Sequence, residues 1–160
     1  MTEILDRIIG GGIHEVPVEK LIPTLKAFMS TEKARDKIIH LLLKQIKDHC
    51  QEFTLRELCD LSLVLREFAG AYEGIYELIE PYILSKVNSL TEIDIMLAIR
   101  GFYNTELSRR YQILDVLESI VINQAGNMHK DNLRELLAFY TQYRMGSRIL
   151  IETLINNTKE

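Results

Sequence analysis

A pattern of helix-capping residues returns about every 37 positions along this chain, and this spacing constrains the fold more than any other feature. It is clearest at Thr54 and Glu57, which stand at the N-cap and N3 positions of a capping box. Phe53 and Leu58 flank them at the two positions of a hydrophobic staple. The same pattern returns in three further hexapeptides, which begin at Val16, Leu90 and Met128. The staple positions are apolar in all four copies, which predicts four copies of one structural unit.

Apolar positions inside the four copies also agree at helical spacing. They form the sets Leu21/Leu58/Ile95/Leu133, Phe28/Leu65/Phe102/Tyr140, Ile39/Tyr76/Ile113/Ile151 and Leu42/Ile79/Val116/Leu154. A single helix pair cannot bury two apolar faces, so each pair has to stack on its neighbours. We therefore expect an all-α fold with nine helices: a right-handed α-solenoid of about four 37-residue helix-turn-helix repeats, preceded by a half-repeat helix. Its handedness is taken from similar repeats.

The expected organisation is one helical-repeat domain. It comprises a half-repeat over 1–15 and repeats over 16–52, 53–89, 90–127 and 128–160. The first helix, over 2–9, matches the second helix of a repeat and is followed by three glycines. Either the array starts with a half-repeat or the chain is cut from a longer one.

Three local irregularities are expected within this array. The one additional residue of the third repeat is placed in the turn-rich linker 123–127. Pro23 is expected to kink its helix or to delay its start to about Thr24, and Pro81 to interrupt and kink another helix.

Composition excludes several classes of protein. Of 160 residues, 47% are hydrophobic and 26% charged, as in folded globular proteins, and the net charge of −4 gives no global attraction for nucleic acid. No apolar run approaches the ~18 residues of a membrane span. The first residues resemble neither a secretory signal nor a transit peptide, so we expect a protein that is not secreted. Cys50 and Cys59 could be neighbours, and we expect reduced thiols in the core.

The repeat resembles a known family. A unit of 37 residues is longer than the tetratricopeptide unit of about 34 and shorter than HEAT units. With openings such as those at Phe53 and Met128, it resembles the heptatricopeptide-type repeats of organellar proteins of the Fas-activated serine/threonine kinase-like (FASTK-like) and RAP-domain group. The resemblance implies a mitochondrial location, with a role in RNA metabolism or as a structural subunit; otherwise we expect a cytoplasmic protein. No RAP-like module follows the fourth repeat, which argues against RNA processing.

No catalytic or metal-binding constellation is apparent, so we expect neither an enzyme nor a cofactor. The glycines at 10–12 lack the Gly-Lys-Ser/Thr ending of a phosphate-binding loop. His49, Cys50 and Cys59 could meet, but a zinc site needs a fourth ligand. Glu77 and Glu80 are typical of a solvated helix face.

Charge varies along the array. Residues 17–52 carry seven basic and five acidic groups, a net of +2, whereas 53–89 carry three and six, a net of −3. Residues 90–127 carry three and five, a net of −2, and 128–160 carry five and four, a net of +1. The middle of the array is therefore acidic.

Arginine and tyrosine gather near the turns of the third and fourth repeats. The candidate partner- or RNA-binding residues are Arg100, Tyr103, Arg109, Arg110, Tyr111, Tyr140, Tyr143, Arg144 and Arg148. Arginines and tyrosines along one edge of the repeat array could stack on the bases and pair with the phosphates of single-stranded RNA. The same edge equally suits a protein interface, or the residues simply cover helix ends. Because the total charge is acidic, we expect first a non-catalytic scaffold for other protein subunits; the resemblance implies a structural subunit or assembly factor of a mitochondrial complex. RNA binding in organellar RNA metabolism is the alternative.

Overall fold

The computed structural model describes residues 16–30, 36–66, 72–104 and 110–159, which form eight α-helices and three short 3-10 helices and contain no strand. For these residues the prediction of an all-α fold is confirmed. The expected helix over 2–9 and the glycines at 10–12 lie outside the described residues. No helix in the described ranges has the length and apolarity needed to cross a membrane.

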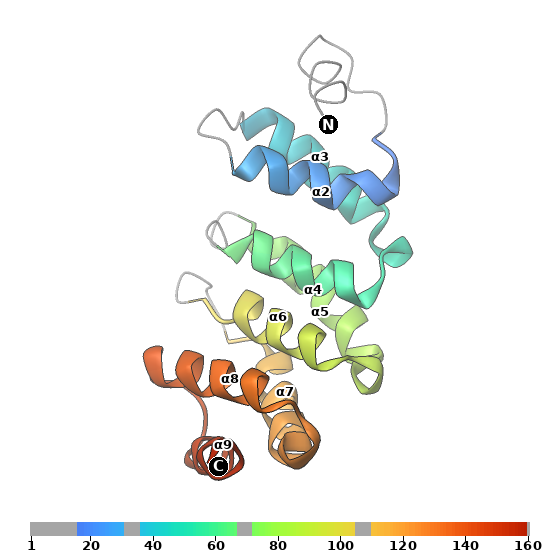
Figure 1. Ribbon diagram of the computed structural model, residues 1–160. Coiled ribbons are helices and arrows are strands. Elements are labelled where there is room, and N and C mark those ends of the chain that lie inside the picture. Colours follow the sequence, from blue (N-terminus) through green and yellow to red (C-terminus); the bar gives the residue numbers. More distant parts are fainter. Residues whose placement is uncertain (1–15, 31–35, 67–71, 105–109, 160) are drawn as a thin grey trace.

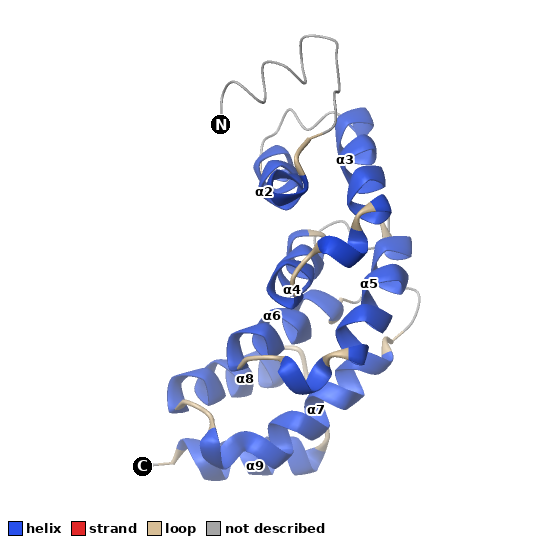
Figure 2. Ribbon diagram, turned by 90° about the vertical axis from the view of Figure 1, so that its right-hand side faces the viewer, coloured by secondary structure: helices blue, strands red, loops and turns tan. Residues whose placement is uncertain are grey.

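The helices are arranged as successive pairs in two layers (Figures 1 and 2). One layer holds α2 (Val18–Met29), α4 (Leu55–Val64), α6 (Glu92–Phe102) and α8 (Lys130–Gln142). The other holds α3 (Asp36–Asp48), α5 (Glu73–Ser85), α7 (Gln112–Gln124) and α9 (Arg148–Thr158). Each helix contacts the other member of its pair, and within the first layer α2 contacts α4, α4 contacts α6, and α6 contacts α8. The pairs are joined by the 3-10 helices η1 (Cys50–Glu52), η3 (Val87–Ser89) and η4 (Ala125–Asn127).

The predicted capping box is present at the start of α4 and also of α6. The Thr54 hydroxyl accepts a hydrogen bond from the Glu57 backbone N–H, and the Glu57 carboxylate accepts one from the Thr54 backbone N–H. Thr91 and Asp94 form the same pair of bonds at α6. Each box satisfies backbone donors that have no partner within the helix, which fixes where the helix begins.

Most of the predicted core positions are buried. The set Leu21/Leu58/Ile95/Leu133 is at most 2% exposed, and Phe28/Leu65/Phe102/Tyr140 at most 5%. The two sets from the second layer need a correction. Val116 and Ile151 are only partly buried, whereas their neighbours Leu117 and Leu150 are completely buried.

The third pair explains the shift at Val116. Leu65 and Phe102 are 37 positions apart, but the buried residues Ile79 and Leu117 are 38 apart. The additional residue therefore lies between Phe102 and Leu117, between α6 and α7. The prediction that it lies in the linker 123–127 is wrong, because a turn between two helices absorbs an insertion without moving either buried face.

The two helix-internal prolines do not end their helices. Pro23 lies within α2 and Pro81 within α5, so the alternative start near Thr24 and the interruption at Pro81 are both wrong. Both proline rings are exposed. In each helix, water can therefore reach the backbone carbonyl four residues before the proline, which has lost its hydrogen bond.

A glycine sets the distance between α4 and α6. A Cβ added at Gly101 would stand 2.0 Å from Ser62 Oγ and 2.7 Å from the Leu63 backbone nitrogen. Only a residue without a side chain permits this close approach. The equivalent positions, 37 and 38 residues away, are Val64 and Phe139. The spacing of neighbouring helices in this layer therefore differs from pair to pair.

Candidate functional site

Two of the tyrosines predicted as partner- or RNA-binding residues belong to the core. Tyr111 and Tyr140 are each 1% exposed. The Tyr111 ring lies 5.6 Å from that of Phe102 and 5.9 Å from that of Tyr76. Burial raises the pKa of the Tyr140 hydroxyl, and the Glu118 charge raises it further. The prediction that Tyr111 and Tyr140 contact a ligand at the surface is therefore corrected, because neither buried ring can meet a base or a partner side chain.

Tyr103 and Tyr143 remain partly exposed and form an aromatic cluster with Phe139. The ring centroids of Tyr103 and Tyr143 are 5.3 Å apart, and Phe139 lies 4.8 Å from Tyr143. Arg66 extends its guanidinium over this cluster, 5.1 Å from the Tyr143 ring. The Tyr103 hydroxyl also donates a hydrogen bond to the Tyr143 carbonyl. Sequence reasoning missed Arg66 and Phe139, because Arg66 belongs to a pair two steps from Tyr143 along the chain.

Three of the predicted arginines pair with carboxylates. Arg100 bonds to Glu135 at 2.8 Å, which links α6 to α8. Arg110 bonds to Asp115 at 2.7 Å and Arg148 to Glu152 at 2.6 Å. These pairs balance the charge of three of the five arginines predicted to bind a partner or RNA.

Arg144 and Arg109 are the other two arginines predicted to bind a partner or RNA. Arg144 is exposed in the connection between α8 and α9, where its φ of 50° lies in the left-handed region. Arg109 lies outside the described residues.

A hollow of about 520 Å³ brings several of the predicted residues together. We call it the edge hollow; its lining is Tyr103, Arg110, Asp115, Glu118, Arg144, Met145, Gly146 and Ser147. It lies where α7 meets the connection between α8 and α9. Arg100 and Arg148 do not line it. Two guanidinium groups, two carboxylates and a tyrosine suit a polar surface of mixed charge, whereas a bare phosphate chain would meet the carboxylates of Asp115 and Glu118.

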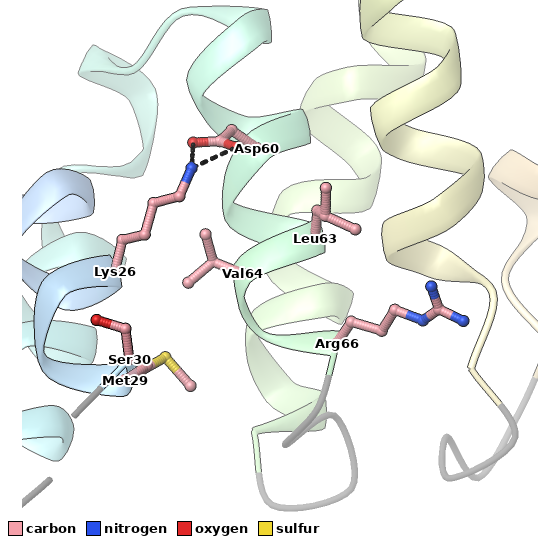
Figure 3. Close-up of a pocket in the computed structure, with 7 residues that line it drawn as sticks. All are labelled: Lys26, Met29, Ser30, Asp60, Leu63, Val64 and Arg66. Carbon is pink, nitrogen blue, oxygen red and sulfur yellow. Dashed lines mark hydrogen bonds and ion pairs between the residues drawn. The ribbon is translucent and has the colours of Figure 1, made fainter. Parts of the chain in front are cut away.

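A second hollow, of about 360 Å³, lies between α2 and α4 (Figure 3). It is lined by Lys26, Met29, Ser30, Asp60, Leu63, Val64 and Arg66. Lys26 reaches across it to Asp60 at 3.4 Å, whereas Arg66 points toward α6. Sequence reasoning did not predict this hollow, because it depends on the spacing of two helices that lie far apart along the chain.

The thiols and the histidines form no reactive centre among the described residues. Cys50 and Cys59 are free and buried, as predicted. Burial, with a further contribution from the Asp94 charge, raises the pKa of Cys59 to about 12, which keeps it protonated and unreactive. His49 bonds through Nδ1 to Glu52 at 2.7 Å. No group of three or more His, Cys, Asp or Glu in the described ranges is placed to hold a metal ion.

Comparison with known proteins gives no relative. No protein-family model matches the chain, and no significant match was found among curated proteins or solved structures. The resemblance to heptatricopeptide-type repeats therefore stays a prediction from the residues.

Proposed function

We propose that the four helix pairs are the repeats of a right-handed α-solenoid, and that this solenoid is a non-catalytic scaffold for other proteins. Support for the repeat comes from the packing. Equivalent positions in successive pairs are buried, and each first-layer helix contacts its counterpart in the next pair. A stack of this kind exposes a long surface relative to its core, which is how helical-repeat proteins bind their partners.

The observation that carries the proposal is the charge balance of the predicted edge. Arg110 enters the edge hollow already paired with Asp115, and Glu118 lies in the same hollow. RNA binding needs several unpaired cations that displace counterions from phosphates, and the part of this edge that the structure describes offers few. A protein surface can match both signs of charge and can pack on the partly exposed rings of Tyr103 and Tyr143.

The same proposal includes a non-catalytic role and a mitochondrial location, each of which rests on one observation. Neither hollow brings a nucleophile together with a histidine base in its lining, which supports a non-catalytic role. A place in a mitochondrial complex, as structural subunit or assembly factor, rests on the resemblance of the repeats alone.

RNA binding stays the second candidate because of two residues. Arg144 is exposed in the lining of the edge hollow, and Tyr143, which precedes it in the chain, is partly exposed. A cation adjoining an aromatic ring is a unit that binds single-stranded RNA. We rank it second because the other arginines of the edge that the structure describes, Arg100, Arg110 and Arg148, are paired with carboxylates.

Capture of partners from native lysate tests the proposal. The tagged chain is incubated with and without nuclease, beside a variant with Arg110→Glu and Arg144→Glu and a control with Lys20→Glu and Lys86→Glu. We expect protein partners that survive nuclease, are lost with the edge variant, and persist with the control. Partners that disappear on nuclease treatment would favour RNA, and partners that bind all three chains equally would exclude the edge as the interface.

A further inference from the structure

The exposed face of α3 carries a row of basic side chains. Lys37, Lys44 and Lys47 are all exposed and stand at spacings of seven and three residues, which places them on one side of a helix. We call these three residues the lysine stripe. His40 is exposed on the same side. The opposite side holds the buried residues Ile38, Ile39, Leu42, Leu43 and Ile46. The helix therefore divides sharply into a core side and a basic side.

The lysine stripe has no ion-pair partner among the described residues. Two basic side chains that bridge helices elsewhere are matched by carboxylates, Lys26 by Asp60 and Arg100 by Glu135. On α3, among the residues whose side chains are described, Asp48 in the last turn is the exposed acid beside the row. Because like charges one turn apart repel, an unmatched row favours association with an anionic surface.

The surroundings of the lysine stripe limit the shape of that anionic surface. In the same layer α5 exposes Glu77 and α7 exposes Asp115, so the basic row does not continue along the stack. Its length is that of α3, whose 13 residues extend for about 20 Å. A long polyanion that followed the layer would therefore pass from cations to carboxylates. A ligand about three helical turns long would contact the lysines without reaching those carboxylates.

Base recognition has little support on this face. The exposed ring of His40 packs edge-on against Tyr72, with 5.7 Å between centroids, so neither ring stands out as a platform for stacking. The cations are lysines, which act as point charges and do not form the planar pairs that arginine makes with phosphates. Carboxylates spaced along a helix match such a row in sign and in period.

We propose that the lysine stripe is a docking site for an acidic helix of a partner protein, laid along α3 with glutamates or aspartates on one face. The inference rests on the proposed scaffold function and adds the chemical character of one partner. It concerns a different helix from the edge hollow, so each surface can be tested without the other.

Fluorescence anisotropy with two synthetic peptides tests the proposal. Both are alanine-based helices of about 16 residues with the same number of glutamates. In one the glutamates occupy a single face at spacings of three, four and seven residues; in the other they are distributed around the helix. We expect the single-face peptide to bind at about 50 mM salt and to weaken at about 150 mM, as screening requires.

Charge-reversal variants identify the surface. Lys37→Glu, Lys44→Glu and Lys47→Glu together should weaken binding of the single-face peptide at least tenfold, or about 1.4 kcal/mol. The control changes Lys20, Lys86 and Lys159 to glutamate, which alters the net charge equally on other surfaces, and should change affinity less than about twofold. Circular dichroism establishes that both variants fold.

Four results would overturn the assignment. They are equal binding of the two peptides, equal weakening by the two variants, no binding at about 50 mM salt, and tighter lysine-dependent binding of a uridine oligonucleotide. If the peptide fails while the edge variant still loses protein partners from lysate, the scaffold proposal stands and only the lysine stripe is excluded. If the peptide binds but lysate yields no edge-dependent protein, the edge hollow is excluded.

Discussion

Asp94 is a buried carboxylate that joins two neighbouring helix pairs. It closes the capping box of α6 with Thr91 and also pairs with Arg56 of α4, while its side chain is only 6% exposed. Burial raises the pKa of the Asp94 carboxyl, but the hydrogen bonds from Arg56 and Thr91 and the Arg56 charge outweigh burial and leave the pKa below its usual value. Asp94 therefore stabilises the fold in its charged form.

We expect Asp94→Asn to lower the free energy of unfolding by about 1–3 kcal/mol at pH 7. Because the pKa is lowered on folding, the stabilisation is present above the unfolded value of about 3.9 and is lost as pH falls through the lower folded value. In urea titrations, the difference in free energy of unfolding between variant and wild type should be smaller at about pH 3 than at pH 7. Asp60→Asn, at the more exposed pair with Lys26, serves as the control, and a difference that is constant with pH would contradict this account.

Gly101 makes a second prediction at the scale of single residues. Gly101→Ala should lower the free energy of unfolding by about 1–3 kcal/mol, because its Cβ would meet the backbone of α4. Gly74→Ala is a matched control within α5, where an added Cβ meets nothing within 4 Å. That change should be neutral or stabilise by up to about 1 kcal/mol. Equal effects of the two changes on urea unfolding would mean that α4 and α6 are not in close contact.

The helix elements are connected by side chains that reach from one helix to the start of another. Glu80 of α5 accepts a hydrogen bond from the Ile113 backbone N–H of α7 at 3.0 Å, and Glu118 of α7 accepts one from Ser147 at 3.1 Å. Glu92 of α6 accepts one from His129, just before α8, at 3.1 Å. The acidic middle of the chain thus supplies carboxylates to helix N-termini, where negative charge is favoured.

Removal of such a cap should destabilise the fold. Glu80 is 8% exposed, and we expect Glu80→Ala to lower the free energy of unfolding by about 0.5–2 kcal/mol, the range for losing an N-terminal cap. Glu152→Ala, in an exposed pair with Arg148, should change it by less than about 1 kcal/mol. Thermal unfolding of the two variants compares them directly, and a larger effect at Glu152 would contradict the capping role of Glu80.

The parts of this architecture that sequence could predict are those carried by residues close together in the chain. The capping box at Thr54 spans four residues, and the staple at Phe53 and Leu58 spans six, so both could be recognised directly. The close approach at Gly101 could not, because it depends on Ser62 in another helix. Tyr111 clusters in sequence with arginines near the turn of the third repeat, which predicts a surface position, but its ring is buried against Phe102 of the neighbouring helix.

At the scale of the whole molecule, the stacked pairs produce surfaces of different character. The edge hollow combines charges of both signs, whereas the lysine stripe on α3 is basic and unmatched among the described residues. Among the described acidic side chains of the central pairs, Glu80 and Glu92 bind the starts of other helices and Asp94 pairs with Arg56, so these carboxylates hold pairs together as well as repel polyanions. This division favours a molecule that recognises proteins at separate places along its length.

Titration of single-stranded RNA tests this central claim most directly. Anisotropy of a labelled oligonucleotide is measured at about 50 and 150 mM salt with the wild-type chain and with Arg110→Ala and Arg144→Ala combined. We expect at most weak binding at low salt, none at the higher salt, and little change in the variant, since Arg110 is already paired. Tight binding that persists at about 150 mM salt and is lost in the double variant would contradict the account and make RNA the ligand of this edge.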